Sequence, residues 1–237
     1  MTTAQPAPSG ARTEIPPIIS VDDHIVEPPH LWQEWLPARY RDRGPRVERR
    51  RLGEMRWVGG AKMYEYELDT PDAPWCDIWF YEDLVHPNKR HVAAVGFDRD
   101  EMTMAPITYD EMRPGCYDPT ARVADMQANH VEASLSFPTL PRFCGQTFYE
   151  ATDRDLGLAC VRAYNDWALD YCAANPKRLF PCGFLPMQEV GAAVEELRRI
   201  AKLGYRAAAV RPVICNDKYP TYPEFDLLWR EFEDLGI

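Results

Sequence analysis

The stretch 179–210, LFPCGFLPMQEVGAAVEELRRIAKLGYRAAAV, decides the fold class of this chain because its hydrophobic period changes twice. It opens with an apolar run at 179–185, which is typical of a buried strand. Helical spacing follows, with apolar side chains at Val190, Ala193, Val194, Leu197 and Ile200. Gly204 is placed to end that helix in a left-handed conformation, and small residues then begin another strand. This order forms a βαβ unit, so the sequence predicts a parallel sheet and an α/β fold.

The same alternation recurs along the chain. We predict four strands, near 18–22, 131–137, 179–185 and 207–211. We predict helices at 118–129, with Asp118 as its N-cap, and at 153–174. A last helix is expected to open with the capping-box spacing Thr221-x-x-Glu224. Four strands can belong to an open doubly wound sheet or to a closed barrel of eight, and periodicity leaves both open.

The segment 28–115 has a different character, since it shows no sustained period and crowds arginine, proline, tryptophan and acidic residues together. Within it, 47–68 alternates weakly and contains turn glycines, which predicts one or two hairpins. We interpret the segment as an insertion after the first strand. A lid over a site and a purely structural cap both stay open.

Composition excludes several classes of partner. The chain has 237 residues and a formal net charge of −10, so we expect no nucleic acid or membrane-surface partner. No stretch approaches the roughly 20 apolar residues of a membrane span, and the polar, proline-bearing residues 1–17 suggest a flexible tail and not a secretory signal. The seven cysteines are spaced singly, which favours reduced thiols and a cytoplasmic protein.

A cluster that could carry chemistry, Asp22-Asp23-His24, follows the first predicted strand. Residues i and i+2 at the end of a strand point to the same side, so Asp22 and His24 can converge on one metal ion while Asp23 points away. A solvated acidic turn with a capping aspartate is the alternative that the triplet alone leaves open.

Around this cluster the sequence resembles the opening of the amidohydrolase-related family, which includes aminocarboxymuconate-semialdehyde decarboxylase. The resemblance begins with Ile-Ile-Ser-Val-Asp-Asp-His-Ile-Val-Glu-Pro-Pro-His-Leu-Trp at 18–32 and extends to the last residue. Further blocks follow in the same order: Leu-Pro-Ala-Arg-Tyr-Arg-Asp-Arg-Gly-Pro-Arg-Val at 36–47, Tyr117-Asp118-Pro119 with Arg122-x-x-Asp125-Met126, Ala163-Tyr164-Asn165-Asp166-Trp167, Pro176-x-Arg178-Leu179 and Leu185-Pro186-Met187-Gln188.

The resemblance implies a (β/α)₈ barrel of the metal-dependent hydrolase type over 18–237, truncated after about four βα units. It implies one divalent ion, held by Asp22 in the first ligand position, where a histidine is usual, and by His24 in the second. Zinc is the expected ion, and the oxygen ligand makes manganese a second candidate. The family's further ligands, a histidine and an aspartate, would lie beyond Ile237.

The function implied is metal-dependent chemistry on a small carboxylated or aromatic substrate. Decarboxylation and hydrolysis both occur in the family, and the residues do not separate them. The alternative is a catalytically incomplete fragment with binding activity or none, because two ligands hold an ion poorly. For a full-length form we expect a homodimer.

Two residues are candidates for binding the substrate. Arg211 follows the fourth predicted strand, where a guanidinium could clamp a carboxylate, and a salt bridge to a neighbouring acid is equally plausible. Phe137 ends the second strand and could line the pocket. His86 and His91 could belong to a lid, but we interpret them as solvated loop histidines, and His30 as exposed.

Overall fold

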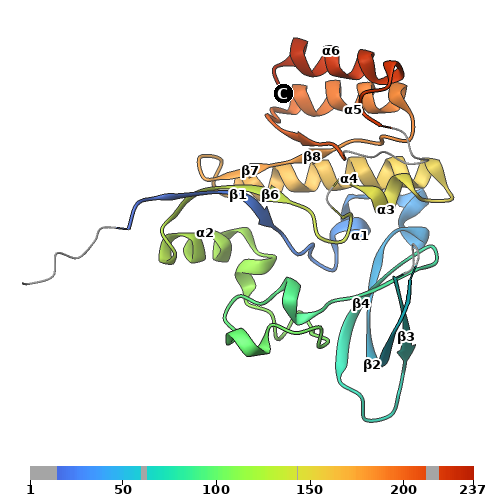
Figure 1. Cartoon of the computed structure of the whole chain (residues 1–237), viewed down its shortest axis with the longest axis vertical. Helices are drawn as coiled ribbons and strands as arrows, with labels where there is room; N and C mark the ends of the chain where they lie inside the picture. The colour runs from blue at the N-terminus through green and yellow to red at the C-terminus, as the bar shows by residue number, and fades with distance from the viewer. Residues whose placement is uncertain (1–14, 60–62, 143, 212–218) are drawn as a thin grey trace, which may run out of the picture.

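The computed structural model describes residues 15–59, 63–142, 144–211 and 219–237 (Figure 1). The strands are β1 (Ile18–His24), β2 (Arg46–Gly59), β3 (Met63–Leu68), β4 (Trp75–Tyr81), β5 (Leu84–Pro87), β6 (Val131–Phe137), β7 (Leu179–Pro181), β8 (Gly183–Phe184) and β9 (Ala208–Ala209). The α-helices are α1 (Leu31–Trp35), α2 (Pro119–Ala128), α3 (Gln146–Tyr149), α4 (Arg154–Ala173), α5 (Val190–Leu203) and α6 (Asp226–Leu235). Short 3₁₀ turns connect them: η1 (Ala38–Arg43), η2 (Arg90–Val92), η3 (Arg99–Glu101), η4 (Pro114–Cys116) and η5 (Pro223–Phe225).

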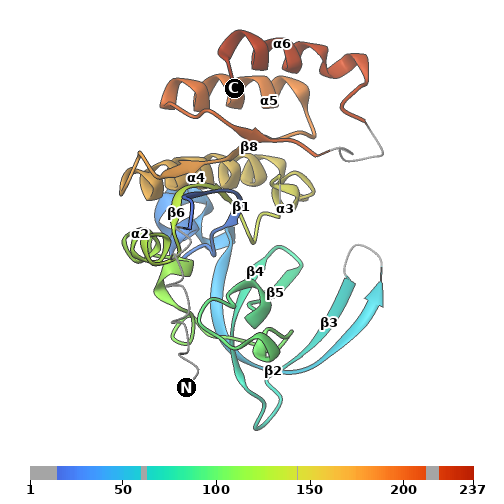
Figure 2. The ribbon, with the colours of Figure 1, turned by 60° about the vertical axis from the view of Figure 1, so that its left-hand side comes forward.

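The parallel strands follow one another in space as they do in sequence. β1 pairs with β6, and β6 pairs with β7. The predicted strand 179–185 is divided at Cys182, because its first part pairs with β6 while β8 pairs with β9. All four predicted strand positions are therefore confirmed as parallel βα units, and Figure 2 shows α4 and α5 covering them.

Capping confirms two helix starts and corrects a third. The side chains of Asp118 and Asp153 accept hydrogen bonds from backbone N–H groups in the first turns of α2 and α4. The capping box predicted at Thr221 and Glu224 is wrong: a 3₁₀ turn occupies Pro223–Phe225, and α6 begins after it without a side-chain cap. Proline at the start of that turn favours the tighter conformation there.

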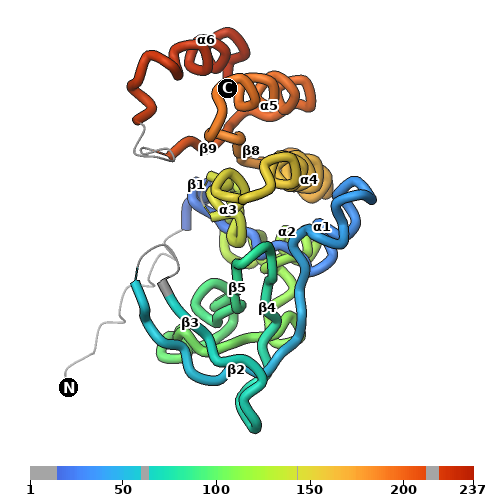
Figure 3. The backbone as a smooth tube through the Cα atoms, turned by 90° about the vertical axis from the view of Figure 1, so that its right-hand side faces the viewer, coloured from blue at the N-terminus to red at the C-terminus, as the bar shows by residue number. Residues whose placement is uncertain are grey.

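The insertion is more regular than its sequence indicates. Strands β2 to β5 form one antiparallel sheet in the order β3-β2-β4-β5, which extends away from the parallel strands (Figure 3). β2 is 14 residues long and pairs with β4 along its first half and with β3 along its second. One or two hairpins were predicted, so the prediction found this element type but missed how long β2 is.

Two further expectations concern the thiols and the helices. All six cysteines in the described part of the chain are free and buried, and Cys215 lies outside it. Cys160 and Cys172 are small core residues, as predicted. No helix among the described residues is long and apolar enough to span a membrane.

A buried carboxylate connects the C-terminal ends of β1 and β6. Glu27, which is 1% exposed, accepts hydrogen bonds from the backbone N–H groups of Thr139 and Leu140 at 2.8 and 2.9 Å. The Thr139 hydroxyl donates to the Ile25 carbonyl, and the Ile25 N–H donates to the Phe137 carbonyl. Burial raises the pKa of the Glu27 carboxyl to about 7, although these two N–H groups lower it. The turn after β6 is thereby held against the end of β1.

A second buried network joins α4, β8 and α5. The Asn165 amide donates to the Phe184 carbonyl and to Glu196, and its oxygen accepts from the Phe184 N–H. Asn165 and Glu196 are both fully buried, and Arg199 of α5 completes the charge balance by pairing with Glu196 at 2.7 Å. The Tyr205 hydroxyl also donates to the Asn165 carbonyl.

We predict that Asn165→Ala lowers the free energy of unfolding by about 2–4 kcal/mol, because it leaves the buried Phe184 N–H and carbonyl groups without their side-chain partner and removes one hydrogen bond from Glu196. Asp170→Ala, at an exposed position of the same helix, should change it by less than about 0.5 kcal/mol. Urea denaturation followed by circular dichroism measures both. Equal effects of the two substitutions would contradict the network's role.

We predict that Glu27 makes stability pH-dependent. Its pKa rises from 4.5 to about 7 on folding, so its stabilising contribution is fully present below pH 4.5 and is lost as pH rises through about 7. The loss amounts to at most about 3 kcal/mol. Urea denaturation of chelator-treated protein at several pH values should show this slope for the wild type and for the exposed-site control Glu132→Gln. It should be absent in Glu27→Gln, and an unchanged slope there would contradict the assignment.

Candidate metal and substrate site

The C-terminal end of β1, which carries Asp22, Asp23 and His24, pairs irregularly with β6. Ser20 pairs with Ser134 and Asp23 with Ser136, so three steps along β1 match two along β6, which is a β-bulge. As predicted, Asp23 points away from its two polar neighbours. Its carboxylate accepts a hydrogen bond from the Ser134 hydroxyl at 2.6 Å and lies 3.6 Å from the guanidinium of Arg122.

Asp22 and His24 face each other. The distance from His24 Nε2 to Asp22 Oδ1 is 3.7 Å. His24 Nδ1 lies 2.8 Å from the carbonyl oxygen of Pro138. Because a carbonyl only accepts, Nδ1 carries the hydrogen, and the nitrogen left to bind a metal ion is Nε2, which faces Asp22. A backbone carbonyl behind a ligating histidine is the usual way in which proteins fix the tautomer of a metal-binding imidazole.

The pair has the geometry and the donors for one divalent ion. Two ligand atoms that each lie about 2.1 Å from an ion are at most about 4.2 Å apart, so a separation of 3.7 Å is compatible with a shared ion. The Asp22 side chain is 77% exposed, so this side of the pair is open. Within the described ranges no group of three histidine, cysteine or acidic side chains could hold a metal ion. Asp22 and His24 therefore fit as part of a ligand set and not as a whole one.

His24 also lines a cavity of about 960 Å³ between the parallel strands and the insertion. Phe137 and Arg211, the two predicted substrate-binding residues, line the same cavity. The rings of Phe137 and His24 lie 6.0 Å apart between centroids. The cavity is further lined by His86, His91, Val92, Pro138, Thr139, Arg142, Cys144, Gln146, Ala209 and Val210. Three of the four residues singled out from the sequence, His24, Phe137 and Arg211, thus line one cavity. The fourth, Asp22, is not among the lining residues, but its carboxylate faces His24.

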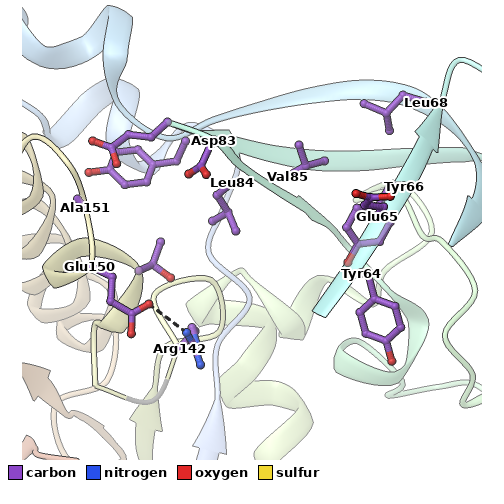
Figure 4. Close-up of a pocket in the computed structure, with 13 residues that line it drawn as sticks. Tyr64, Glu65, Tyr66, Leu68, Asp83, Leu84, Val85, Arg142, Glu150 and Ala151 are labelled. Atoms are coloured by element: carbon purple, nitrogen blue, oxygen red, sulfur yellow. Dashed lines mark hydrogen bonds and ion pairs between the residues drawn. The ribbon is translucent and has the colours of Figure 1, made fainter. Parts of the chain in front are cut away.

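Arg211 makes the salt bridge that one interpretation of its sequence position predicted, and its role in substrate binding stays a prediction. It lines the cavity, and its guanidinium also lies 3.8 Å from the carboxylate of Glu150. Glu150 in turn lies 3.4 Å from Arg142, an ion pair drawn in Figure 4. Arg142 and Glu150 border a second cavity, of about 770 Å³, beside β3 and β5 (Figure 4). One carboxylate outside the first cavity therefore orients two arginines that line it.

The two histidines of the insertion are placed differently from each other. His86 lies on β5 and is partly buried, so its interpretation as a solvated loop residue is wrong. His91 lies on η2 and is exposed, as interpreted from the sequence, and both histidines line the cavity. The hydrophobic period of the sequence could not predict that these two histidines line the cavity. Their direction depends on the pairing of β5 with β4 and on the path of the chain after β5. His30 is exposed, as predicted, and lies 3.9 Å from Glu34.

Comparison with known proteins agrees with this fold. The curated relatives include 2-amino-3-carboxymuconate-6-semialdehyde decarboxylase of Dictyostelium discoideum, 30% identical over 129 residues that cover 54% of this chain and 34% of the relative. They also include gamma-resorcylate decarboxylase of Rhodococcus jostii (strain RHA1), 27% identical over 163 residues, or 63% of this chain and 47% of the relative. The alignments therefore span less than half the length of either relative.

A solved amidohydrolase from Mycobacterium avium subsp. paratuberculosis K-10 superposes with a TM-score of 0.61 at 17% identity, over 94% of this chain and 57% of that one. This match shows a shared fold. The family model described as amidohydrolase matches residues 30–237, a range that begins after His24 and covers most of the sequence. On this match, the chain belongs to the amidohydrolase family.

Proposed function

We propose that this chain is part of a metal-dependent decarboxylase that acts on a small aromatic carboxylate, and that it supplies two of the metal ligands, Asp22 and His24. The observation that carries the proposal is the position of this pair, 3.7 Å apart, at a cavity that Phe137 and Arg211 also border. The names of both curated relatives, which are decarboxylases of carboxylated substrates, support decarboxylation over hydrolysis.

The charge of the cavity supports an anionic substrate. The protein as a whole carries a formal charge of −10, yet no aspartate or glutamate is found among the cavity's described lining residues. Arg142 and Arg211 contribute two fixed positive charges, because a guanidinium stays protonated at any physiological pH. A cationic cavity in an acidic protein attracts a small anion.

Each residue has a distinct task in this proposal. Asp22 and His24 hold the ion, which when bound polarises a carboxylate or carbonyl oxygen of the substrate. Arg211 binds and orients the substrate carboxylate, and the ring of Phe137 provides an apolar face for an aromatic ring. The C–C bond between ring and carboxylate breaks, carbon dioxide leaves, and a proton replaces it on the ring carbon. We assign the remaining metal ligands to parts of the protein outside the described residues.

We predict that Asp22→Ala and His24→Ala each weaken binding of Zn²⁺ or Mn²⁺ at least about tenfold in the protein expressed from its complete reading frame, because each removes one ligand. Asp23→Asn, which alters the neighbouring carboxylate that faces Ser134, should bind metal like the wild type. Equilibrium dialysis with elemental analysis measures this. Full metal content in both alanine variants would overturn the metal assignment. A wild type that binds neither ion would favour a catalytically incomplete fragment.

We predict that Arg211→Ala raises the Kd for benzoate about 10- to 100-fold, because a hydrogen bond to a charged group contributes about 1.5–3 kcal/mol. Arg206→Ala removes an exposed arginine of the segment between α5 and β9 and should leave the Kd unchanged. Isothermal titration calorimetry of the metal-loaded protein measures both. An unchanged Kd in Arg211→Ala would assign this guanidinium to the Glu150 ion pair alone.

A further inference from the structure

The insertion contributes its own polar groups to the cavity, from elements that the parallel strands do not include. His86 lies on β5, the edge strand of the antiparallel sheet, where it pairs with Trp79 of β4. His91 follows on η2, and its backbone N–H donates to the Thr103 carbonyl at 3.0 Å. Both imidazoles border the cavity that His24, Phe137 and Arg211 border from the other elements. The cavity therefore has one wall from the barrel strands and one from the insertion.

A role in holding the metal does not fit these two histidines. Three histidines line the cavity, yet in the described part of the chain no three such groups lie close enough to share an ion. Both imidazoles border the cavity and are placed to contact a bound substrate. The insertion could then contribute to recognition of the substrate and not to the metal centre.

The charges around His86 keep its ring neutral. Burial, with smaller electrostatic contributions from Lys89, His91 and Arg142, lowers the pKa of His86 to about 4. Burial and Lys89 lower the pKa of His91 in the same direction. Lys89 itself is directed elsewhere, since its ammonium donates to the Tyr66 hydroxyl at 3.1 Å. At neutral pH both rings therefore present one donor and one acceptor and no charge.

A neutral donor–acceptor pair suits a substituent that is itself both donor and acceptor. A second carboxylate would match the arginines better than two neutral rings. An apolar substituent would leave the partly buried His86 imidazole without a polar partner in the cavity, which is costly. A hydroxyl group matches both ring nitrogens of an imidazole and carries no charge. Gln146, which is 4% exposed and lines the same cavity, adds an amide to this polar wall.

Building on the proposed function, we propose that His86 and His91 are specificity-determining residues, which hydrogen-bond a ring hydroxyl of a hydroxylated aromatic carboxylate. The carboxylate lies toward Arg211 and the metal pair, and the hydroxyl lies toward the insertion. The antiparallel sheet is then the element that selects among aromatic carboxylates, while the parallel strands supply the groups common to all of them.

The test compares ligands that differ only in the hydroxyl. Calorimetry of the metal-loaded protein, expressed from its complete reading frame, gives the Kd for benzoate and for 2-, 3- and 4-hydroxybenzoate. We expect His86→Phe and His91→Phe each to weaken binding of the preferred hydroxybenzoate about three- to tenfold while the Kd for benzoate stays unchanged. The glutamine substitutions His86→Gln and His91→Gln keep a donor and an acceptor and should retain most of the hydroxyl preference. His30→Phe, at the exposed histidine, is the matched control.

Each outcome decides a different claim. Loss of the hydroxyl preference in the phenylalanine variants, with benzoate binding intact, supports the inference. An unchanged preference in both variants overturns it and leaves the proposed function standing. Equal loss of affinity for benzoate and hydroxybenzoates overturns it in favour of a structural role for the two rings. A wild type that binds no aromatic carboxylate overturns the proposed function and this inference with it.

Discussion

The site depends on how the end of β1 is held against the end of β6. Parallel pairing aligns the two strands, and a bulge in β1 then turns Asp22 and His24 one way and Asp23 the other. Beyond the strands, two further contacts hold this junction. The Glu27 carboxylate accepts hydrogen bonds from two N–H groups of the turn after β6, and the Pro138 carbonyl accepts one from His24 Nδ1 and so fixes its tautomer. A buried carboxylate is costly, and here it stabilises the turn whose Pro138 carbonyl contacts the His24 imidazole.

The same junction brings the two parts of the chain together. The parallel strands carry Phe137, and Arg211 follows β9. The insertion between β1 and β6 carries His86 on its antiparallel sheet and His91 on η2. The arginines at the cavity are oriented from outside by Glu150, so the cavity stays free of acidic side chains among its described residues. In the function that we propose, this arrangement separates two tasks: general attraction of an anion by the fixed positive charges, and discrimination between anions by neutral groups on the insertion.

Sequence reasoning predicted those parts in which the local pattern and the fold agree. The alternation of apolar runs and helical faces gave all four parallel strand positions, and Asp118 marked the start of α2 through its capping chemistry. The strand-end argument predicted that Asp22 and His24 face each other and that Asp23 points away, as the structure shows. The role of Asp22 and His24 as metal ligands, which the family resemblance implies, stays a prediction. The features that were missed depend on long-range contacts. The length of β2 and the direction of His86 follow from strand pairing, and the start of α6 follows from Pro223, which no periodicity marks.

The central claim is that Asp22 and His24 share one divalent ion, with the imidazole bound through Nε2. Anomalous X-ray diffraction from crystals grown with Mn²⁺ or Zn²⁺, measured on both sides of the metal's absorption edge, tests it most directly. The account predicts one strong anomalous peak within bonding distance of Asp22 Oδ1 and His24 Nε2, with the His24 Nδ1 to Pro138 contact retained. A peak elsewhere, or a metal-soaked crystal in which Asp22 and His24 bind no ion, would contradict it.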